Sequence, residues 1–203
     1  MKKAVTGFAL FCLSMSSMAA ASPVSNGAQN APKPAVVGNV PDLSSVGMNE
    51  TVGCLEGPMA QFGRYLGDWD IQDMTLQKDG SGWVEGKGAR WNFTCVGNGT
   101  VIQDFWMPNG GGFGTNLRTY NANEDRWDIF WAFAGMTEYS HISAEQNAAG
   151  DIVMNYVTPI PSPLRRITFF TPDANGWDWK QEMSMDDGAT WFDVYRIKAT
   201  RRK

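Results

Sequence analysis

The chain has little of the residue types that most often bind metals or carry acid–base catalysis. Its 203 residues include one histidine, His141, and three cysteines. A zinc site needs three or four Cys, His or carboxylate ligands close together, and the sequence has no Cys or His pattern of that kind. We therefore predict no metal site and no resident cofactor.

The chain also lacks an apolar run that could span a membrane. A transmembrane helix needs roughly 20 consecutive apolar residues, and the run 4–13 is about half that long. This run follows Lys2 and Lys3 and leads into small residues that end at Ala21, which is the layout of a secretory signal peptide. We expect residues 1–21 to be a signal peptide, and the mature protein to be periplasmic or secreted and not membrane-spanning.

An excess of basic residues is missing as well. Lys and Arg number 17 and Asp and Glu number 21, so the formal net charge is −4. Loss of residues 1–21 would remove Lys2 and Lys3 and no acid, which would move the net charge from −4 to −6. Because phosphate contacts depend on clustered Lys and Arg, we expect no nucleic-acid partner.

Two cysteines, Cys54 and Cys95, remain beyond the expected signal peptide. In an oxidising compartment an even pair of cysteines is most simply a disulfide, so the sequence predicts a bridge between them. A bridged pair would leave no thiolate for nucleophilic catalysis. A serine hydrolase is disfavoured too, because the chain has no G-x-S-x-G motif.

Composition divides the remaining chain at about residue 58. Residues 22–57 hold several prolines among small and polar residues, so we expect a disordered leader and N-terminal segment there. Residues 58–66 favour one or two helical turns, because proline is accepted at the first helical position. We expect residues 58–203 to form one β-barrel domain.

Short β-rich runs follow at regular spacing, separated by clusters of Gly, Asn, Asp and Pro. This spacing favours an antiparallel sandwich or barrel of about ten strands. The expected strands are 68–77, 82–96, 100–107, 113–121, 126–134, 137–145, 151–158, 164–171, 176–185 and 190–200.

The segment Ser184–Trp191 has the pattern S-x-D-x-G-x-T-W, which predicts a tight hairpin rather than a catalytic centre. Asp side chains in turns commonly bond their own backbone, and Gly188 allows backbone conformations that other residues rarely adopt. We therefore interpret Asp186 as a structural residue of the turn.

Aromatic residues are the most abundant candidates for a binding site. All nine tryptophans lie between residues 69 and 191, and Trp127, Ile129 and Trp131 share one face of their strand, as Trp177 and Trp179 do. Such rings can fill a solid core. They can also line the interior of a small barrel that holds one ligand, and both interpretations stay open.

The opening of the first expected strand resembles a known family. Gly67-Asp68-Trp69 is similar to the G-x-W motif of lipocalins and related calycin barrels. The resemblance implies that the Trp closes one end of the barrel and packs against an Arg of the last strand. Candidates for that partner are Arg196, Arg201 and Arg202.

Further motifs resemble a bacterial family of secreted lipocalin-like barrels with no assigned function. The resemblance covers about residues 58 to 202, and the number of expected strands leans towards barrels of the fatty-acid-binding or haem-binding kind. It implies an antiparallel calycin-type barrel with a short N-terminal helix. The motifs are Leu66-Gly67-x-Trp69, Arg90-Trp91-x-Phe93, Ile102-Gln103-Asp104-x-Trp106, Arg118-x-Tyr120, Trp127 with Trp131, Arg166 and the S-x-D-x-G-x-T-W hairpin.

We expect an exported protein that binds a small apolar or amphipathic molecule in an aromatic barrel interior. The candidate polar residues are Arg118, His141 and Arg166, because an inward, unpaired Arg would receive a carboxylate. A structural pair of an Arg with Asp104 or Glu138 is the alternative. The candidate wall residues are Trp91, Phe105, Tyr120, Trp131, Tyr139 and Trp179.

Other functions remain open from the sequence. The same interior could belong to an isomerase, cyclase or lyase in which His141 acts as acid or base. It could also belong to a haem-binding barrel with His141 as the axial ligand. If Ile142 points inward, however, period 2 places His141 on the outer face. A solid barrel acting as an envelope interaction module is a third possibility, and the oligomeric state is left undetermined.

Overall fold

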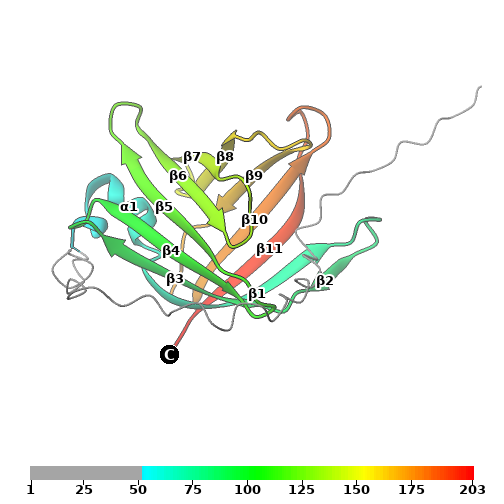
Figure 1. Cartoon of the computed structure of the whole chain (residues 1–203), viewed down its shortest axis with the longest axis horizontal. Helices are drawn as coiled ribbons and strands as arrows, with labels where there is room; N and C mark the ends of the chain where they lie inside the picture. The colour runs from blue at the N-terminus through cyan, green and yellow to red at the C-terminus, as the bar shows by residue number, and fades with distance from the viewer. Residues whose placement is uncertain (1–51) are drawn as a thin grey trace, which may run out of the picture. The chain divides into compact units, whose positions relative to one another are not determined.

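A computed structural model of the chain describes residues 52–203 (Figure 1). The expected signal peptide and most of the expected leader lie outside these residues. The 3-10 turns η2 and η3 precede the helix α1, and strands follow to the C-terminus. The bounds are η2 Val52–Leu55, η3 Gly57–Met59, α1 Ala60–Gly63, β1 Gly67–Leu76, β2 Trp83–Glu85, β3 Ala89–Val96, β4 Val101–Pro108, β5 Gly114–Asn121, β6 Arg126–Phe133, β7 Ser140–Gln146, β8 Ile152–Thr158, β9 Leu164–Phe169, β10 Gly176–Ser184 and β11 Phe192–Arg201.

Within residues 52–203, β1 and β3 to β11 form a closed antiparallel ring. The strands from β3 to β11 pair in chain order, β1 pairs with β3, and β11 returns to pair with β1. Closure leaves no free edge within the ring. The predicted fold class, an all-β antiparallel lipocalin-like barrel of about ten strands with a short helix, is confirmed.

The strand β2 lies outside the ring and pairs only with β1 among the described strands. The single strand expected over 82–96 is split into β2 and β3 at Gly86 and Gly88. The backbone N–H of Gly86 donates to the Asp73 carbonyl oxygen, and that of Gly88 donates to the Asp73 carboxylate, both at 2.8 Å. A Cβ at Gly86 would lie 2.0 Å from this carboxylate, so glycine permits the close approach that breaks the strand.

The helix α1 and the residues after it cover one end of the barrel, which we call the closed end (Figure 1). Gln61 Oε1 accepts a hydrogen bond from Trp127 Nε1, and Tyr65 Oη donates one to the Phe170 carbonyl oxygen, both at 2.9 Å. Because the strands alternate in direction, the connections after β4, β6, β8 and β10 lie at the opposite end. We call this opposite end the open end.

Aromatic rings fill the interior at the closed end. Tyr65, Phe169 and Trp177 meet in edge and stacked arrangements with ring centroids 5.2 to 5.4 Å apart. Such contacts add to the free energy gained by burying the rings. This half of the barrel is therefore a solid core. Its largest members are Phe62, Tyr65, Trp69, Trp91, Phe93, Trp127, Phe169 and Trp177.

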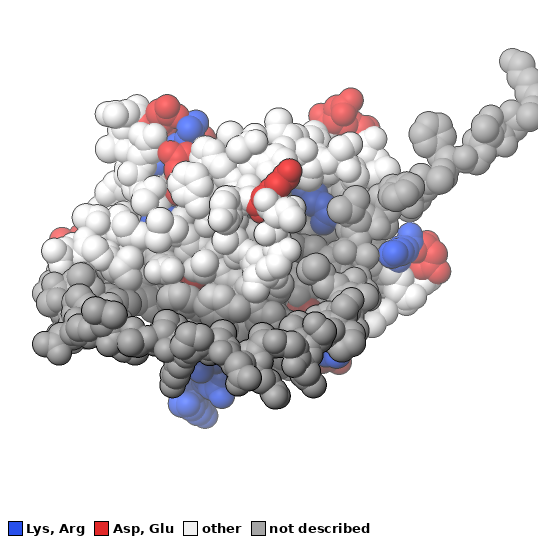
Figure 2. All heavy atoms as spheres, in the orientation of Figure 1, with Lys and Arg blue, Asp and Glu red and all other residues white. Residues whose placement is uncertain are grey.

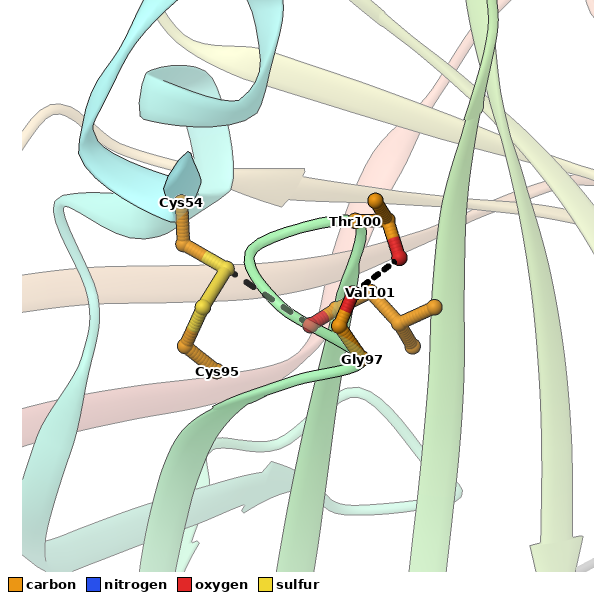
Figure 3. Close-up of a disulfide and its surroundings, with 5 residues drawn as sticks. All are labelled: Cys54, Cys95, Gly97, Thr100 and Val101. Atoms are coloured by element: carbon orange, nitrogen blue, oxygen red, sulfur yellow. Dashed lines mark hydrogen bonds between the residues drawn. A yellow bond between two sulfur atoms is a disulfide. The ribbon is translucent and has the colours of Figure 1, made fainter. Parts of the chain in front are cut away.

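The predicted disulfide between Cys54 and Cys95 is present (Figure 3). It joins η2 to β3, and both cysteines are fully buried. The Cys54 sulfur also lies 3.6 Å from the Val101 carbonyl oxygen. The bridge makes η2 part of the packed structure. Packing therefore begins before residue 58, the position at which the composition of the sequence predicts the start of the domain.

The G-x-W motif makes the contact that the resemblance to lipocalins implies, and Arg201 supplies the arginine. The Arg201 guanidinium carbon lies 4.1 Å from the centroid of the Trp69 ring. Trp69 Nε1 donates to the Tyr65 carbonyl oxygen at 2.7 Å. The indole is thus held between the helical segment and the last strand, at the seam where β11 meets β1.

The S-x-D-x-G-x-T-W segment forms the connection between β10 and β11, as predicted. The Asp186 carboxylate accepts hydrogen bonds from Ser184 Oγ and from the Thr190 backbone N–H, both at 2.8 Å. Gly188 has φ +92°, and Trp191 Nε1 donates to its carbonyl oxygen at 2.9 Å. The backbone conformation of Gly188 and these hydrogen bonds explain why Ser, Asp, Gly, Thr and Trp stand at the fixed positions of the motif.

Candidate functional site

The inward-facing side chains become more exposed towards the open end. On β6, Trp127 and Ile129 have no exposed surface, whereas Trp131 is partly exposed. On β9, Phe169 and Ile167 are buried and Arg165 is partly exposed. The same change takes place on β1, β4, β8 and β11. The first partly exposed inward residue on each of these six strands is Asp73, Trp106, Trp131, Tyr156, Arg165 or Tyr195, and we call these six the mouth residues.

Four of the six mouth residues are aromatic, and they continue the buried core. The ring centroids of Trp106 and Trp91 are 5.0 Å apart, and those of Tyr195 and Trp179 are 5.8 Å apart. Two of the four partly exposed rings, Trp106 and Tyr195, therefore rest on a buried tryptophan. Aromatic surface that faces inward and still meets solvent is the surface that a small molecule would cover on entering the barrel.

Two buried tryptophans beneath the mouth residues have an unused hydrogen-bond donor. Trp91 is 5% exposed and Trp179 is 9% exposed. Neither indole N–H has an acceptor among the described residues. A buried donor without an acceptor costs free energy, on the order of 1–3 kcal/mol. An oxygen atom of a bound molecule could relieve that cost.

Polar groups lie at the open end beside these rings. Tyr195 Oη donates to Asp73 Oδ2 at 2.7 Å, and burial together with this carboxylate raises the pKa of the Tyr195 hydroxyl. Arg165 Nη1 donates to Gln181 Oε1 at 2.7 Å, and Gln181 Nε2 donates to the Tyr156 hydroxyl at 3.4 Å. Burial also raises the pKa of Tyr156. Both tyrosines are therefore neutral donors at physiological pH.

Arg118 does not reach the mouth but forms a structural ion pair with Asp104. Both side chains are buried, and the Asp104 carboxylate also accepts a hydrogen bond from Asn116 Nδ2 at 3.1 Å. The Arg118 guanidinium carbon lies 4.9 Å from the Phe62 ring centroid. Burial lowers the pKa of Arg118 while Asp104 opposes that change. The alternative of a pair with Asp104, left open by the sequence, is what the structure has.

His141 lies on the outer face of β7, because its neighbour Ile142 is buried inside the barrel. Its Nε2 atom is 2.9 Å from Asp128 Oδ1, and its ring stacks on Phe130 with centroids 5.0 Å apart. An acid–base or haem-binding role inside the barrel requires an inward-facing histidine, and His141 does not face inward. The geometry gives no support to axial haem ligation within the barrel.

Four other predicted site residues also lie away from the mouth. Phe105 is on the outer face of β4, since Asp104 and Trp106 point inward, and Tyr139 is a loop residue that is 76% exposed. Arg166 is on the outer face of β9 and pairs with Glu182 at 2.8 Å. Tyr120 faces inward at the closed end and packs against Trp127. These placements differ from the expectation because the sequence alone does not fix the inner and outer faces.

Three of the predicted wall residues therefore lie at the open half of the barrel: Trp131 is a mouth residue, and Trp91 and Trp179 lie beneath the mouth residues. Sequence reasoning missed the mouth residues Trp106, Tyr156 and Tyr195 and the polar pair Arg165 and Gln181. A signal was present for Gln181, which continues the alternation of Trp177 and Trp179. To predict the other residues, one must know which alternate residues of each strand face inward, and the sequence does not show this.

Two surface hollows in the described part of the chain lie outside the barrel interior. One, of about 420 Å³, lies at the closed end. The other, of about 320 Å³, is on the rim of the open end, between the β8–β9 and β10–β11 connections. The first is lined by residues that include Gln61, Arg64 and Tyr120, and the second by residues that include Ile160, Pro163 and Met185.

Residues 52–203 contain no group of three or more His, Cys, Asp or Glu side chains placed to hold a metal ion. None of the helices over the same residues is long and apolar enough to cross a bilayer. On the face shown in Figure 2, charged atoms occupy small separate areas, and uncharged side chains cover most of the described surface in view.

The ring of antiparallel strands is covered at its closed end, and the Trp of the G-x-W motif lies at the seam of β1 and β11. These features define a lipocalin-like, calycin-type barrel. No protein-family model and no curated protein sequence matches the chain. Among solved structures, the chain is similar to the S-type phycobiliprotein lyase CPES from Guillardia theta, with a TM-score of 0.51 and 10% identity over 76% of this chain and 98% of the lyase. It is also similar to Rv2717c from M. tuberculosis, with a TM-score of 0.47 and 12% identity over 73% of this chain and 99% of that protein.

Proposed function

We propose that the open end of the barrel binds a small apolar or amphipathic molecule. The observation that carries this proposal is the exposure of inward-facing aromatic rings at the open end, on strands whose deeper inward residues are buried. Covering such surface contributes about 25 cal/mol per Å² before the cost of association is subtracted. The Cys54–Cys95 disulfide supports an exported binding protein, because disulfides persist in oxidising compartments.

The site that we propose combines the mouth residues with the two tryptophans beneath them. Trp131 and Trp106 contribute apolar surface, and the N–H groups of Trp91 and Trp179 offer hydrogen bonds to an oxygen of the ligand. Because the closed half is solid, the ligand occupies the open half and keeps one end near the solvent. A molecule with an apolar body and a polar end suits that arrangement.

The test is a titration with N-phenyl-1-naphthylamine, an uncharged probe whose fluorescence rises on entering an apolar site. We expect saturable binding to the wild-type chain and an affinity lowered about tenfold or more in Trp131→Ala, in line with the loss of one large ring that the probe would cover. Phe130→Ala is the matched control, because Phe130 is an exposed aromatic on the outer face of the same strand. No binding to the folded wild type, or equal losses in the two variants, would contradict the proposed site.

A small-molecule lyase or isomerase is the second candidate. The lyase CPES shares the barrel fold, and a carboxylate, Asp73, is hydrogen-bonded to Tyr195 at the mouth. His141 has no part in this candidate enzyme activity, since it lies on the outer face of β7. Mass spectrometry of molecules released from the purified protein would separate the two candidates: a chemically altered ligand supports the enzyme, and an unaltered one supports the carrier.

A further inference from the structure

We propose that the polar end of the ligand is an anionic group, such as a carboxylate, and that Arg165 receives it. This inference rests on the proposed function, and it names the chemistry that the mouth residues recognise. It assigns the receptor to a residue that differs from the two arginines, Arg118 and Arg166, that the sequence favours. The argument depends on where the three arginines point and on which of them already has a counter-charge.

Arg165 faces into the barrel from β9. It shares a face with Ile167 and Phe169, which are 6% and 1% exposed. Directly across the pair of strands, Arg165 is opposite Met183 on β10. The inward position is supported by its hydrogen bond to Gln181, a residue that is 6% exposed. A positive charge is therefore held on the inner wall at the open end.

Arg165 has no carboxylate within 4.0 Å among residues 52–203, in contrast to its two rivals. Arg118 pairs with Asp104 inside the core, and Arg166 pairs with Glu182 on the outer face. A charge that is partly removed from water and has no opposite charge nearby raises the free energy of the folded state. An anion at the mouth would supply the missing charge.

The acidic side chain among the mouth residues, Asp73, is already engaged. Asp73 accepts hydrogen bonds from Tyr195 Oη at 2.7 Å and from the Gly88 backbone N–H at 2.8 Å. Its carboxylate is tied to the β1 side of the barrel and forms no ion pair with Arg165. Among the mouth residues, the acid Asp73 is therefore engaged, whereas the charge of Arg165 is not balanced by a contact.

The donors around Arg165 suit an oxyanion. One of its N–H groups is used by Gln181, and the planar guanidinium retains others in the fork that matches a carboxylate. Tyr156 accepts from Gln181 Nε2 at 3.4 Å, and its own O–H has no acceptor among the described residues. Arg165 and Tyr156, linked through Gln181, can thus donate together to one anionic group.

The apolar neighbours complete the recognition of an amphipathic acid. Trp179 lies two residues before Gln181 on β10, faces the interior with it, and has an unused N–H. Trp131 contributes partly exposed ring surface on β6. An apolar body against these rings, with its anionic end towards Arg165, uses both kinds of surface.

The test compares laurate with dodecan-1-ol, which share an alkyl chain and differ in charge, as displacers of N-phenyl-1-naphthylamine from the full chain. We expect the wild type to bind laurate more tightly than the alcohol. Arg165→Gln should weaken laurate binding about tenfold or more, as expected for a hydrogen bond to a charged group, and should change alcohol binding less than about twofold. Lys198→Gln removes the same charge from an exposed position on β11 and should change neither affinity.

Equal wild-type affinities for laurate and the alcohol, or an unchanged laurate affinity in Arg165→Gln, would overturn the anion proposal and leave the proposed function standing. Failure of the probe itself to bind would overturn both. If Arg165→Gln does not fold, two measurements replace it: Arg165→Lys, which keeps the charge and loses the fork, and the wild-type laurate preference at rising salt. The preference for laurate over the alcohol should be smaller in Arg165→Lys than in the wild type, and it should fall as the salt concentration rises. A preference that stays constant in both measurements would contradict the proposal.

Discussion

The guanidinium of Arg201 covers the indole of Trp69 at the seam between the last and first strands of the barrel, 4.1 Å from the ring centroid. Arg201 Nη1 also donates to the Leu66 carbonyl oxygen at 3.2 Å. Gly67, the first residue of β1, has φ +122°. The contact thus joins the segment after α1, strand β1 and strand β11 at one point.

Gly67→Ala should destabilise the barrel through this contact. A Cβ at position 67 would lie 2.2 Å from Arg201 Nη1, in a backbone conformation that L-residues rarely adopt. We expect the free energy of unfolding to fall by about 1–3 kcal/mol, measured by urea denaturation. Gly110→Ala is the control, because a Cβ there would meet only Lys87 Cδ at 3.5 Å. Equal stabilities of the two variants would show that the seam tolerates a side chain.

Removal of the disulfide should lower stability without changing the fold. The bridge closes a segment of 41 residues in sequence, and the entropy that it removes from the unfolded chain corresponds to about 2–4 kcal/mol. The double variant Cys54→Ser, Cys95→Ser should unfold at lower urea concentration. Reductant should destabilise the wild type and leave the double variant unaffected. A reductant effect of equal size on both proteins would contradict this role of the bridge.

Asp104→Asn should be strongly destabilising, because it leaves the buried Arg118 without its counter-charge. We expect a loss of about 3–5 kcal/mol in the free energy of unfolding. The double variant Asp104→Leu, Arg118→Met removes both charges and should lose less. Because the pair lies below the mouth, the folded double variant should still bind N-phenyl-1-naphthylamine. A folded double variant without binding would place Arg118 in the ligand site.

The Asp186 turn should make stability depend on pH in the acid range. Hydrogen bonds from Thr190 and Ser184 lower the pKa of Asp186 from 3.8 to about 2. Since the folded-state pKa lies below that of the unfolded chain, the contribution is complete above about pH 4. It is lost as the pH falls towards 2. Thermal unfolding between pH 2 and 6 should show a shallower acid dependence in Asp186→Asn than in Asp187→Asn, which removes the same charge one residue away.

His141→Gln should leave probe binding unchanged and cause little loss of stability, because the ring lies on the outer face beside Asp128. Exposed ion pairs contribute about 0–1 kcal/mol. The measurement is a titration of the variant with N-phenyl-1-naphthylamine at neutral pH. A tenfold loss of affinity in the folded variant would return this histidine to the list of ligand-binding candidates and contradict its outward placement.

The local pattern of the sequence determined much about this protein. Alternating runs bounded by turn residues predict the strands, Asp186 and Gly188 predict the last hairpin, and the two cysteines predict the bridge. These features depend on neighbouring residues or on a count, so no knowledge of distant contacts is needed. The run 82–96 was predicted as a single strand but is divided into β2 and β3, because Gly86 approaches Asp73 on another strand.

The tertiary structure alone decided which face of each strand is inside. Alternation groups Trp127 with Trp131, and separates His141 from Ile142, without saying which group points inward, since a shift by one residue exchanges the two faces. Ring closure set those faces and thereby placed Phe105, His141 and Arg166 outside, paired Arg118 with Asp104, and left Arg165 at the open end. The chemistry of the candidate site therefore follows from contacts between strands that are far apart in the chain.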